Sequence, residues 1–228
     1  MADLAIALDL PTAAAALRLV DATGDAATWY KVGPVLFVAD GPTVVRELCA
    51  RGKRVFLDLK WHDIPNTVAG AVAAAAALGV ELATLHLGGG PRMLEAAAAS
   101  RGVALTLVGV GVLTSLAAGE YGTVVGRAVA DLGAEQERLV RLGMAAGLGG
   151  FVTAGSEARR LRALAGPGAL LVVPGIRRAG EPAGDQRRTA TPAEAAAAGA
   201  DLLVVGRHVT AAADPRAAVL ALRAELAA

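Results

Sequence analysis

The chain has 228 residues, of which 55% are hydrophobic and 19% are charged, a balance that excludes a disordered or fibrous protein and suits one large core. Its 22 basic and 21 acidic residues leave a net charge of +1, so the composition lacks the basic excess of a nucleic-acid-binding protein. A single domain over residues 1–228 with a small-molecule ligand is therefore expected.

Short runs rich in Leu, Ile and Val recur between alanine-rich stretches and predict eight β-strands. Alanine makes up 55 of the 228 residues, and this density favours helix between the runs. Most runs are continuously apolar rather than alternating, as in a parallel sheet that is covered on both faces. In chain order, the predicted strands span residues 4–8, 28–32, 54–59, 82–86, 103–110, 150–152, 169–173 and 201–205.

Eight strand–helix alternations in this length predict an α/β fold, a (β/α)8 TIM barrel, whereas an open doubly wound sheet would usually use fewer strands. Two helix starts are marked by local chemistry, a capping box at Thr191-Pro192-Ala193-Glu194 and an Asp214-Pro215 pair. Residues 177–189, rich in Gly, Arg, Asp and Glu, follow the seventh predicted strand. In a barrel this position predicts an active-face loop that closes as a lid.

Only three of the 22 basic residues are lysines, and lysine, unlike arginine, can release a proton. Lys31 and Lys60 each lie at the C-terminal end of a predicted strand, where barrel enzymes build their active sites. Lys53 precedes its strand and is expected to be a solvated surface charge. Position alone therefore makes Lys31 and Lys60 the candidate catalytic lysines.

The third predicted strand carries the densest chemistry in the chain. Period-two alternation points Asp58 and Lys60 in the same direction, so a carboxylate and an ammonium share the barrel mouth, with Asp63 in the loop that follows. A surface ion pair is the simpler interpretation. The apolar run at 55–57 and the only asparagine of the chain, Asn66, favour a functional site instead.

The segment Asp58-x-Lys60-x-x-Asp63-Ile64-Pro65-Asn66-Thr67 resembles the signature of the orotidine 5'-phosphate decarboxylase family. The shorter D-x-K-x-x-D pattern also fits 3-keto-L-gulonate-6-phosphate decarboxylases, but the continuation from His62 to Thr67 is closer to the orotidylate enzymes. Further segments resemble the family in the same order along the chain: Ala7-Leu8-Asp9, Lys31-Val32-Gly33, Leu113-Thr114-Ser115, Pro174-Gly175-Ile176-Arg177, Gly184-Asp185-Gln186-Arg187-Arg188 and Val205-Gly206-Arg207.

Three positions depart from the family pattern. The segment from His86 to Gly90 stands where the family often has His-Ala-Ser-Gly-Gly, Val152-Thr153-Ala154-Gly155 replaces a Val-Cys-Ser-Pro-like segment, and Trp61 replaces a common Phe. The charged positions are intact, so these changes bear on local packing and on a dimer surface rather than on the reaction.

The resemblance implies decarboxylation of orotidine 5'-monophosphate to uridine 5'-monophosphate and CO2, the last step of de novo UMP synthesis, with no cofactor and no metal. It implies a homodimer with shared active sites, in which Asp63, Ile64 and Thr67 reach into the partner's site. Lys60 would protonate the C6 carbanion within a network of Lys31, Asp58, Lys60 and Asp63. The implied substrate-binding residues are Asp9 and Lys31 at the ribose, Thr114 at the pyrimidine, and Arg177, Gln186, Gly206 and Arg207 toward the phosphate.

The phosphate expectation also has support from the residues themselves, because Gly206-Arg207 follows the eighth predicted strand and Arg177 follows the seventh. Barrels often bind phosphate in this region, and backbone N–H groups with guanidinium groups form an anion site. Arg207→Ala is therefore expected mainly to weaken substrate binding.

Two rival functions remain open. One is a metal-dependent sugar-phosphate decarboxylase of the same superfamily, and the other is a non-catalytic nucleotide-binding dimer. His62, His86 and His208 are too scattered for a metal-ligand motif. Gly88-Gly89-Gly90 is better explained as a strand-to-helix turn than as a nucleotide-binding loop.

The remaining features concern location and surface. Cys49 is the only cysteine, which excludes an intramolecular disulfide and favours a reducing compartment. The N-terminus lacks the pattern of a secretory signal, and the uncharged stretches 64–80 and 102–119 are interrupted by Gly, Pro or polar residues. A cytoplasmic protein with no membrane partner is expected. A mixed-charge helical face is expected to be solvated, namely Glu135, Glu137, Arg138 and Arg141.

Overall fold

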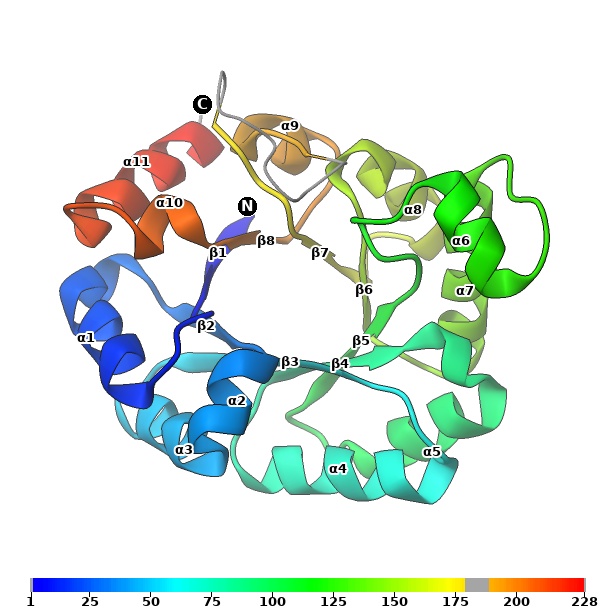
Figure 1. Ribbon diagram of the computed structural model, residues 1–228, viewed down its shortest axis with the longest axis horizontal. Helices are drawn as coiled ribbons and strands as arrows, with labels where there is room; N and C mark the ends of the chain where they lie inside the picture. The colour runs from blue at the N-terminus through cyan, green and yellow to red at the C-terminus, as the bar shows by residue number, and fades with distance from the viewer. Residues whose placement is uncertain (1, 179–188, 228) are drawn as a thin grey trace.

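The computed structural model describes residues 2–178 and 189–227, and its eight strands form a closed barrel. Each strand pairs in parallel with the next, and β8 pairs with β1. Figure 1 shows the strands as an inner ring that the helices surround. The predicted (β/α)8 TIM barrel is therefore confirmed. The strands are β1 (Asp3–Ala7), β2 (Trp29–Val32), β3 (Arg54–Trp61), β4 (Leu82–His86), β5 (Thr106–Val110), β6 (Gly150–Val152), β7 (Leu170–Val173) and β8 (Leu202–Val205).

All eight strands lie where the apolar runs predicted them, and the differences are at the ends. β3 continues two residues beyond the predicted end, to Trp61, while β5 begins at Thr106 rather than at Val103. Val103 is fully exposed in a turn that follows the preceding helix. Its β-branched side chain extended the apolar run without belonging to the sheet.

Local sequence explains many of the helix starts, because six of the α-helices begin with a proline, whose fixed φ suits the first turn. The expected capping box is present: the Thr191 hydroxyl accepts from the Glu194 amide at 3.2 Å, and the Glu194 carboxylate accepts from the Thr191 amide at 2.8 Å. Asp214 likewise accepts from the Ala217 amide at 2.9 Å. The α-helices are α1 (Ala13–Thr23), α2 (Pro34–Asp40), α3 (Pro42–Ala50), α4 (Pro65–Ala77), α5 (Pro91–Ser100), α6 (Ala118–Val125), α7 (Leu132–Ala145), α8 (Ala158–Ala165), α9 (Pro192–Ala197), α10 (Arg207–Thr210) and α11 (Pro215–Ala227), with 3₁₀ turns η1 (Gly24–Ala26), η2 (Leu87–Gly89) and η3 (Gly155–Glu157).

The barrel has two apolar cores, as expected when strands are buried on both faces. Inside the ring, one cluster centres on Trp29, Phe56 and Leu82. Between the strands and the helices lies a much larger cluster that includes Leu4, Ile6 and most other buried aliphatic side chains. Adjacent residues of β1 thus enter different cores, which explains why its sequence is continuously apolar.

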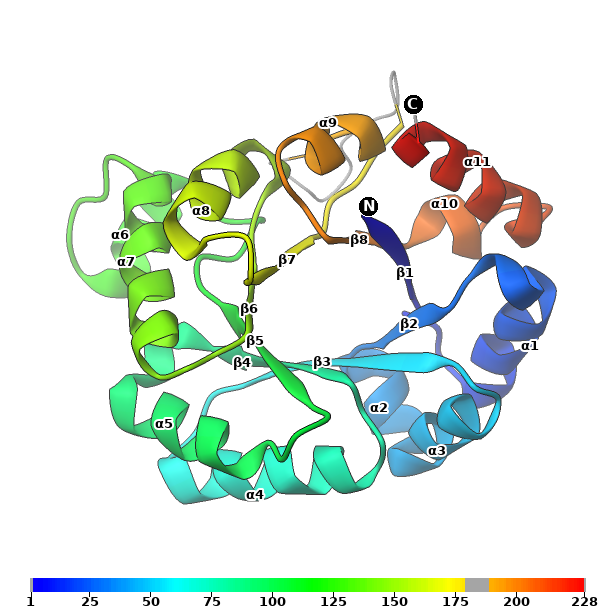
Figure 2. The ribbon, with the colours of Figure 1, turned by 180° about the vertical axis from the view of Figure 1, so that it is seen from behind.

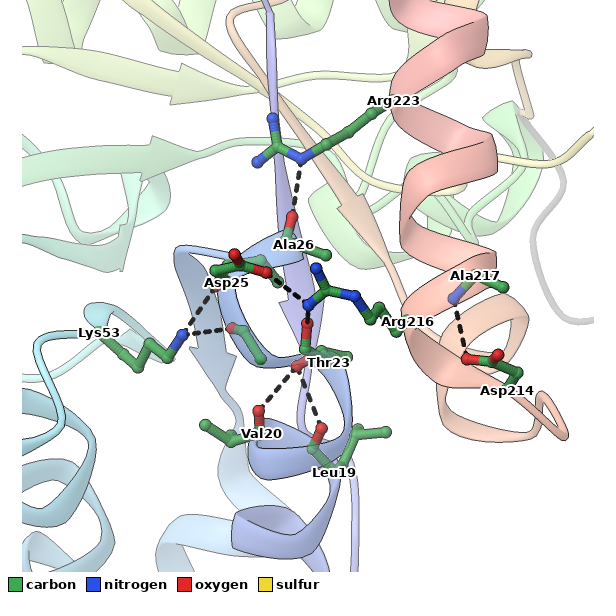
Figure 3. Close-up of polar contacts among 12 residues, drawn as sticks. Leu19, Val20, Thr23, Asp25, Ala26, Lys53, Asp214, Arg216, Ala217 and Arg223 are labelled. Atoms are coloured by element: carbon green, nitrogen blue, oxygen red, sulfur yellow. Dashed lines mark hydrogen bonds and ion pairs between the residues drawn. The ribbon is translucent and has the colours of Figure 1, made fainter.

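The last helix closes the outer layer against the first. α1 and α11 lie side by side in both views of the ribbon (Figures 1 and 2). Arg223 of α11 donates to the Ala26 carbonyl at 2.8 Å and to the Asp3 carboxylate at 2.7 Å, and Arg216 pairs with Asp25 (Figure 3). These contacts tie α11 to η1 and to the start of β1.

Two surface expectations were wrong in part, because Lys53 and Glu135 are less solvated than expected. Lys53 (Figure 3) is not simply a solvated charge: its ammonium donates to the carbonyl of Gly24, the first residue of η1, at 2.6 Å, and to that of Ala27, the residue after η1, at 3.1 Å. Glu135 is 8% exposed and forms ion pairs with Arg127 and Arg138. The pattern of charges on α7 could not show that the chain after α6 returns to cover Glu135.

Among the described residues, no helix combines the length and the apolar character that crossing a bilayer requires.

Candidate active site

A cavity of about 380 Å³ opens at the C-terminal ends of the strands, within the size range of small-molecule sites. Its lining comes from every strand except β4 and from the loops that follow them. Apolar side chains such as Phe56 and Val172 form part of the lining, and the charged groups lie among them. The expected site residues that line it are Asp9, Lys31, Asp58, Lys60, Thr114, Arg177, Gly206 and Arg207.

Asp58 is the centre of a charge network in this cavity. One carboxylate oxygen lies 2.8 Å from the Lys60 ammonium, and the other lies 3.5 Å from the Lys31 ammonium. Lys31 also contacts Asp9 at 3.1 Å. The network therefore alternates in charge, from Asp9 through Lys31 and Asp58 to Lys60, and it joins the ends of three neighbouring strands.

The surroundings of Asp58 keep it ionised. Burial alone would raise the pKa of this carboxyl group, because desolvation disfavours its charge. The charges of Lys31 and Lys60 and hydrogen bonds from Lys60 and Thr84 act in the opposite direction, and together they hold the pKa of Asp58 below its ordinary value. A fixed negative charge consequently lies between two ammonium groups.

Lys60 occupies an irregular part of β3. The pairing of β3 with β4 shifts between Leu57 and Trp61, and the φ of Lys60 is +50°, the only positive value at a non-glycine residue in the described chain. Such a conformation costs about 1–3 kcal/mol and persists only where the surroundings impose it. The expected period-two alternation still gives the right result, since Asp58 and Lys60 both reach the cavity.

The structure does not bring the other motif residues into this cavity. Asp63, Ile64 and Thr67 are exposed and do not line it. The Asp63 carboxylate accepts from the Ile64 amide at 2.6 Å, just before α4. Ile64, a large aliphatic side chain, is 67% exposed. These residues can therefore complete a site only by contact with another molecule or by movement.

Arg177, Gly206 and Arg207 lie together on the β7 and β8 side of the cavity lining. Arg207 opens the short helix α10 directly after Gly206, and the Arg177 guanidinium donates to the Ile176 carbonyl at 2.8 Å. Gln186 and most of the expected lid fall outside the described residues. The described part of the site thus has cations at one side and the Asp58 network at the other.

Sequence reasoning missed two buried polar residues behind the cavity. Thr84 of β4 contacts both Asp58 and Lys60, and Gln136 of α7 bonds the Val112 amide at 2.8 Å and the Val152 carbonyl at 2.9 Å. A polar residue within a buried apolar strand is a usable signal for Thr84. No comparable signal marks Gln136, because glutamine on a helix is ordinary.

His62 and His86 stack with ring centroids 5.1 Å apart, and burial, His62 and Lys60 together lower the pKa of His86. The pair provides only two ligands. Within residues 2–178 and 189–227, no cluster of three or more His, Cys, Asp or Glu side chains is arranged to hold a metal ion.

Comparison with known proteins gives a consistent result. Residues 2–222 match the model of the orotidine 5'-phosphate decarboxylase / HUMPS family. The orotidine 5'-phosphate decarboxylase from Anaeromyxobacter sp. (strain K) is 49% identical to this chain over 96% of both chains. The enzyme of the same name from Nitratidesulfovibrio vulgaris (strain DP4) is 47% identical over 100% of this chain and 99% of its own. The crystal structure of orotidine 5'-phosphate decarboxylase from Lactobacillus acidophilus has a TM-score of 0.88, 30% identity and full coverage of both chains.

Proposed function

The chain belongs to the orotidine 5'-phosphate decarboxylase / HUMPS family, and we propose that it converts orotidine 5'-phosphate to uridine 5'-phosphate and CO2 with Lys60 as the proton donor. The high identity to relatives that carry the decarboxylase name, over nearly all of both chains, supports this member of the family over the sugar-phosphate enzymes. The enzyme is a carboxy-lyase of pyrimidine synthesis.

The reaction requires stabilisation of a carbanion that has no adjacent electron sink. When the bond from C6 to the carboxylate breaks, its electron pair stays on C6, CO2 leaves, and a proton must then be delivered to C6. The Lys60 ammonium meets both needs, since it is a positive charge beside the developing negative charge and also an acid. The Asp58 carboxylate holds this ammonium in place at 2.8 Å.

One observation carries the proposal: the Lys60 ammonium lies in the cavity, 2.8 Å from a buried, ionised Asp58 that also faces Lys31. The Lys31–Asp58 pair of this network is buried, and burying such a charge pair is costly. It is therefore better explained by a site for an anionic substrate than by a contribution to stability. The mechanism as proposed needs no cofactor, because the protein's own lysine moves the proton.

The remaining expected residues have roles in binding. Asp9 and Lys31 would hold the ribose hydroxyls, and Thr114 would contact the pyrimidine, in keeping with their positions on the cavity lining. Arg177 and Arg207 would bind the phosphate with the Gly206 backbone, assisted by Gln186 from the loop. Binding energy from the phosphate could then position the reacting end of the substrate.

A homodimer is part of the proposal. Asp63, Ile64 and Thr67 would complete the partner's site, which accounts for their exposure and for the apolar side chain of Ile64 at the surface. A cytoplasmic location accords with the single cysteine of the chain and with a substrate of nucleotide metabolism.

The first test mixes the purified protein with orotidine 5'-phosphate in buffer that contains EDTA and follows the loss of ultraviolet absorbance. Wild type should turn over, and Lys60→Ala should lower kcat by at least about a hundredfold, because positioned proton donors typically contribute that much. Lys53→Ala is the matched control, since Lys53 lies outside the cavity, and should keep its turnover.

Unchanged turnover in Lys60→Ala would overturn the proposed mechanism. Turnover by wild type that EDTA abolishes would instead favour a metal-dependent decarboxylase. A folded wild type that binds uridine 5'-phosphate but does not turn over orotidine 5'-phosphate would favour a binding protein.

A further inference from the structure

Thr84 is the one β4 residue that faces the irregular part of β3. Leu57 pairs with Ala83, and the next pairing joins Trp61 to Leu85. Three residues of β3, from Asp58 to Lys60, therefore stand opposite Thr84 alone. A regular ladder cannot satisfy the backbone groups of such an insertion, so other groups must replace the missing partners.

The Thr84 hydroxyl replaces one of them. Its oxygen accepts a hydrogen bond from the Lys60 amide at 2.9 Å, and its proton is donated to a carboxylate oxygen of Asp58, also at 2.9 Å. That same carboxylate oxygen accepts from the Lys60 ammonium at 2.8 Å. Thr84 thus contacts the backbone of Lys60 directly and its charged end through Asp58.

The side chain has no access to substrate. Thr84 is fully buried, and it does not line the cavity. The Thr84 hydroxyl donates its single proton to Asp58 and accepts from the Lys60 amide. A methyl group in its place could do neither. An aliphatic residue at position 84 consequently leaves both Asp58 and the Lys60 amide with one partner fewer in a buried place.

We propose that Thr84 is a positioning residue for the decarboxylation, which holds Lys60 in its left-handed backbone conformation and fixes the Asp58 carboxylate against the Lys60 ammonium. The proposal rests on the function proposed above for Lys60. The strained conformation of Lys60 needs such a restraint, because a lysine in open chain would leave the positive-φ region.

The test uses the full-length protein with three substitutions. Thr84→Val removes the hydroxyl with little change in shape, and Thr84→Ser keeps the hydroxyl. Thr23→Val is the matched control, because Thr23 is also a fully buried threonine whose hydroxyl bonds to carbonyls, those of Leu19 and Val20 at the end of α1 (Figure 3).

Thr84→Val should lower kcat about ten- to a hundredfold while KM changes less than about threefold, because the proton donor is misplaced and the binding groups are not. Thr84→Ser should restore most of kcat. The acid limb of the kcat profile should move to higher pH in Thr84→Val, since Asp58 loses a hydrogen bond to its charged form while Lys31 and Lys60 still face it. Thr23→Val should lower the unfolding midpoint without any of these kinetic changes.

A Thr84→Val protein with wild-type kcat, or a Thr84→Ser protein as impaired as Thr84→Val, would overturn the proposal. If Thr84→Val does not fold, Thr84→Ala, which also lacks the hydroxyl, takes its place. Hydrogen exchange of the Lys60 amide gives a reading without turnover: it should be faster in Thr84→Val than in Thr84→Ser. If wild type itself does not act on orotidine 5'-phosphate, the proposed function fails, and unchanged Lys60 exchange would separately refute the role of Thr84.

Discussion

At the scale of single residues, Asp58 is buried between two cationic neighbours, and this determines how its substitution changes the stability of the protein. Lys31 is 7% exposed and has Asp58 and Asp9 as its acidic neighbours within 4 Å. Asp58→Asn leaves two ammonium groups facing each other across a neutral amide. Removing one partner of a buried pair typically costs about 3–5 kcal/mol, so Asp58→Asn should lower the free energy of unfolding by about that amount at pH 7.

The pH dependence of this loss follows from the lowered pKa of Asp58 in the folded protein. An acid whose folded pKa is depressed contributes its full stability above its unfolded pKa, about 3.9 for aspartate. That contribution disappears as the pH falls through the lower folded pKa. Urea unfolding at stepwise lower pH should therefore show the gap between wild type and Asp58→Asn narrowing below about pH 4. A gap that is constant with pH would contradict the pKa shift.

At the scale of elements, Gln136 joins α7 to two strand ends of the barrel. It accepts from the Val112 amide and donates to the Val152 carbonyl, and both valines line the cavity. Gln136→Leu leaves both buried backbone groups without these partners, at about 1–3 kcal/mol each. We expect the free energy of unfolding to fall by about 2–6 kcal/mol and KM to rise, because the loop that carries Thr114 follows Val112. Met144→Ala on the same helix is the control and should change stability by less than about 1 kcal/mol, since Met144 is 39% exposed. Wild-type KM in Gln136→Leu would show that this loop does not depend on the amide.

The helices and strands also show which features of the fold and of the site could be predicted from the sequence. Hydrophobic runs predicted all eight strands, and the lysines at strand ends predicted the cavity, because both depend on patterns of a few adjacent residues. The Arg127 partner of Glu135 and the partners of Lys53 could not be predicted, since they come from segments brought close only by the fold. The same holds for the bulge in β3: the sequence 58–60 reads as regular alternation, and only pairing with β4 reveals the extra residues and the positive φ of Lys60.

At the scale of the whole molecule, only part of the sequence motif that runs from Asp58 to Thr67 lines the cavity. The Asp58–Lys60 part of the motif lines the cavity, and the Asp63–Thr67 part faces outward from the start of α4. Exposure of Ile64 beside a charged residue suits a surface that a second copy covers. In a two-fold dimer, each of the two sites would then combine Lys60 of one copy with Asp63 of the other copy.

Mixing two inactive variants tests this arrangement directly. Lys60→Ala and Asp63→Ala should each be inactive, but a mixed dimer has one site that combines an intact Lys60 with an intact Asp63. With free exchange, half of the dimers are mixed and one of their two sites is whole, so an equimolar mixture should recover about a quarter of the wild-type activity. Lys60→Ala mixed with Asp58→Asn should recover none, because both changes affect the same chain's part of the site. If the mixture of Lys60→Ala and Asp63→Ala stays inactive although native mass spectrometry, with one variant isotopically labelled, detects mixed dimers, then Asp63 serves its own chain by moving to the cavity.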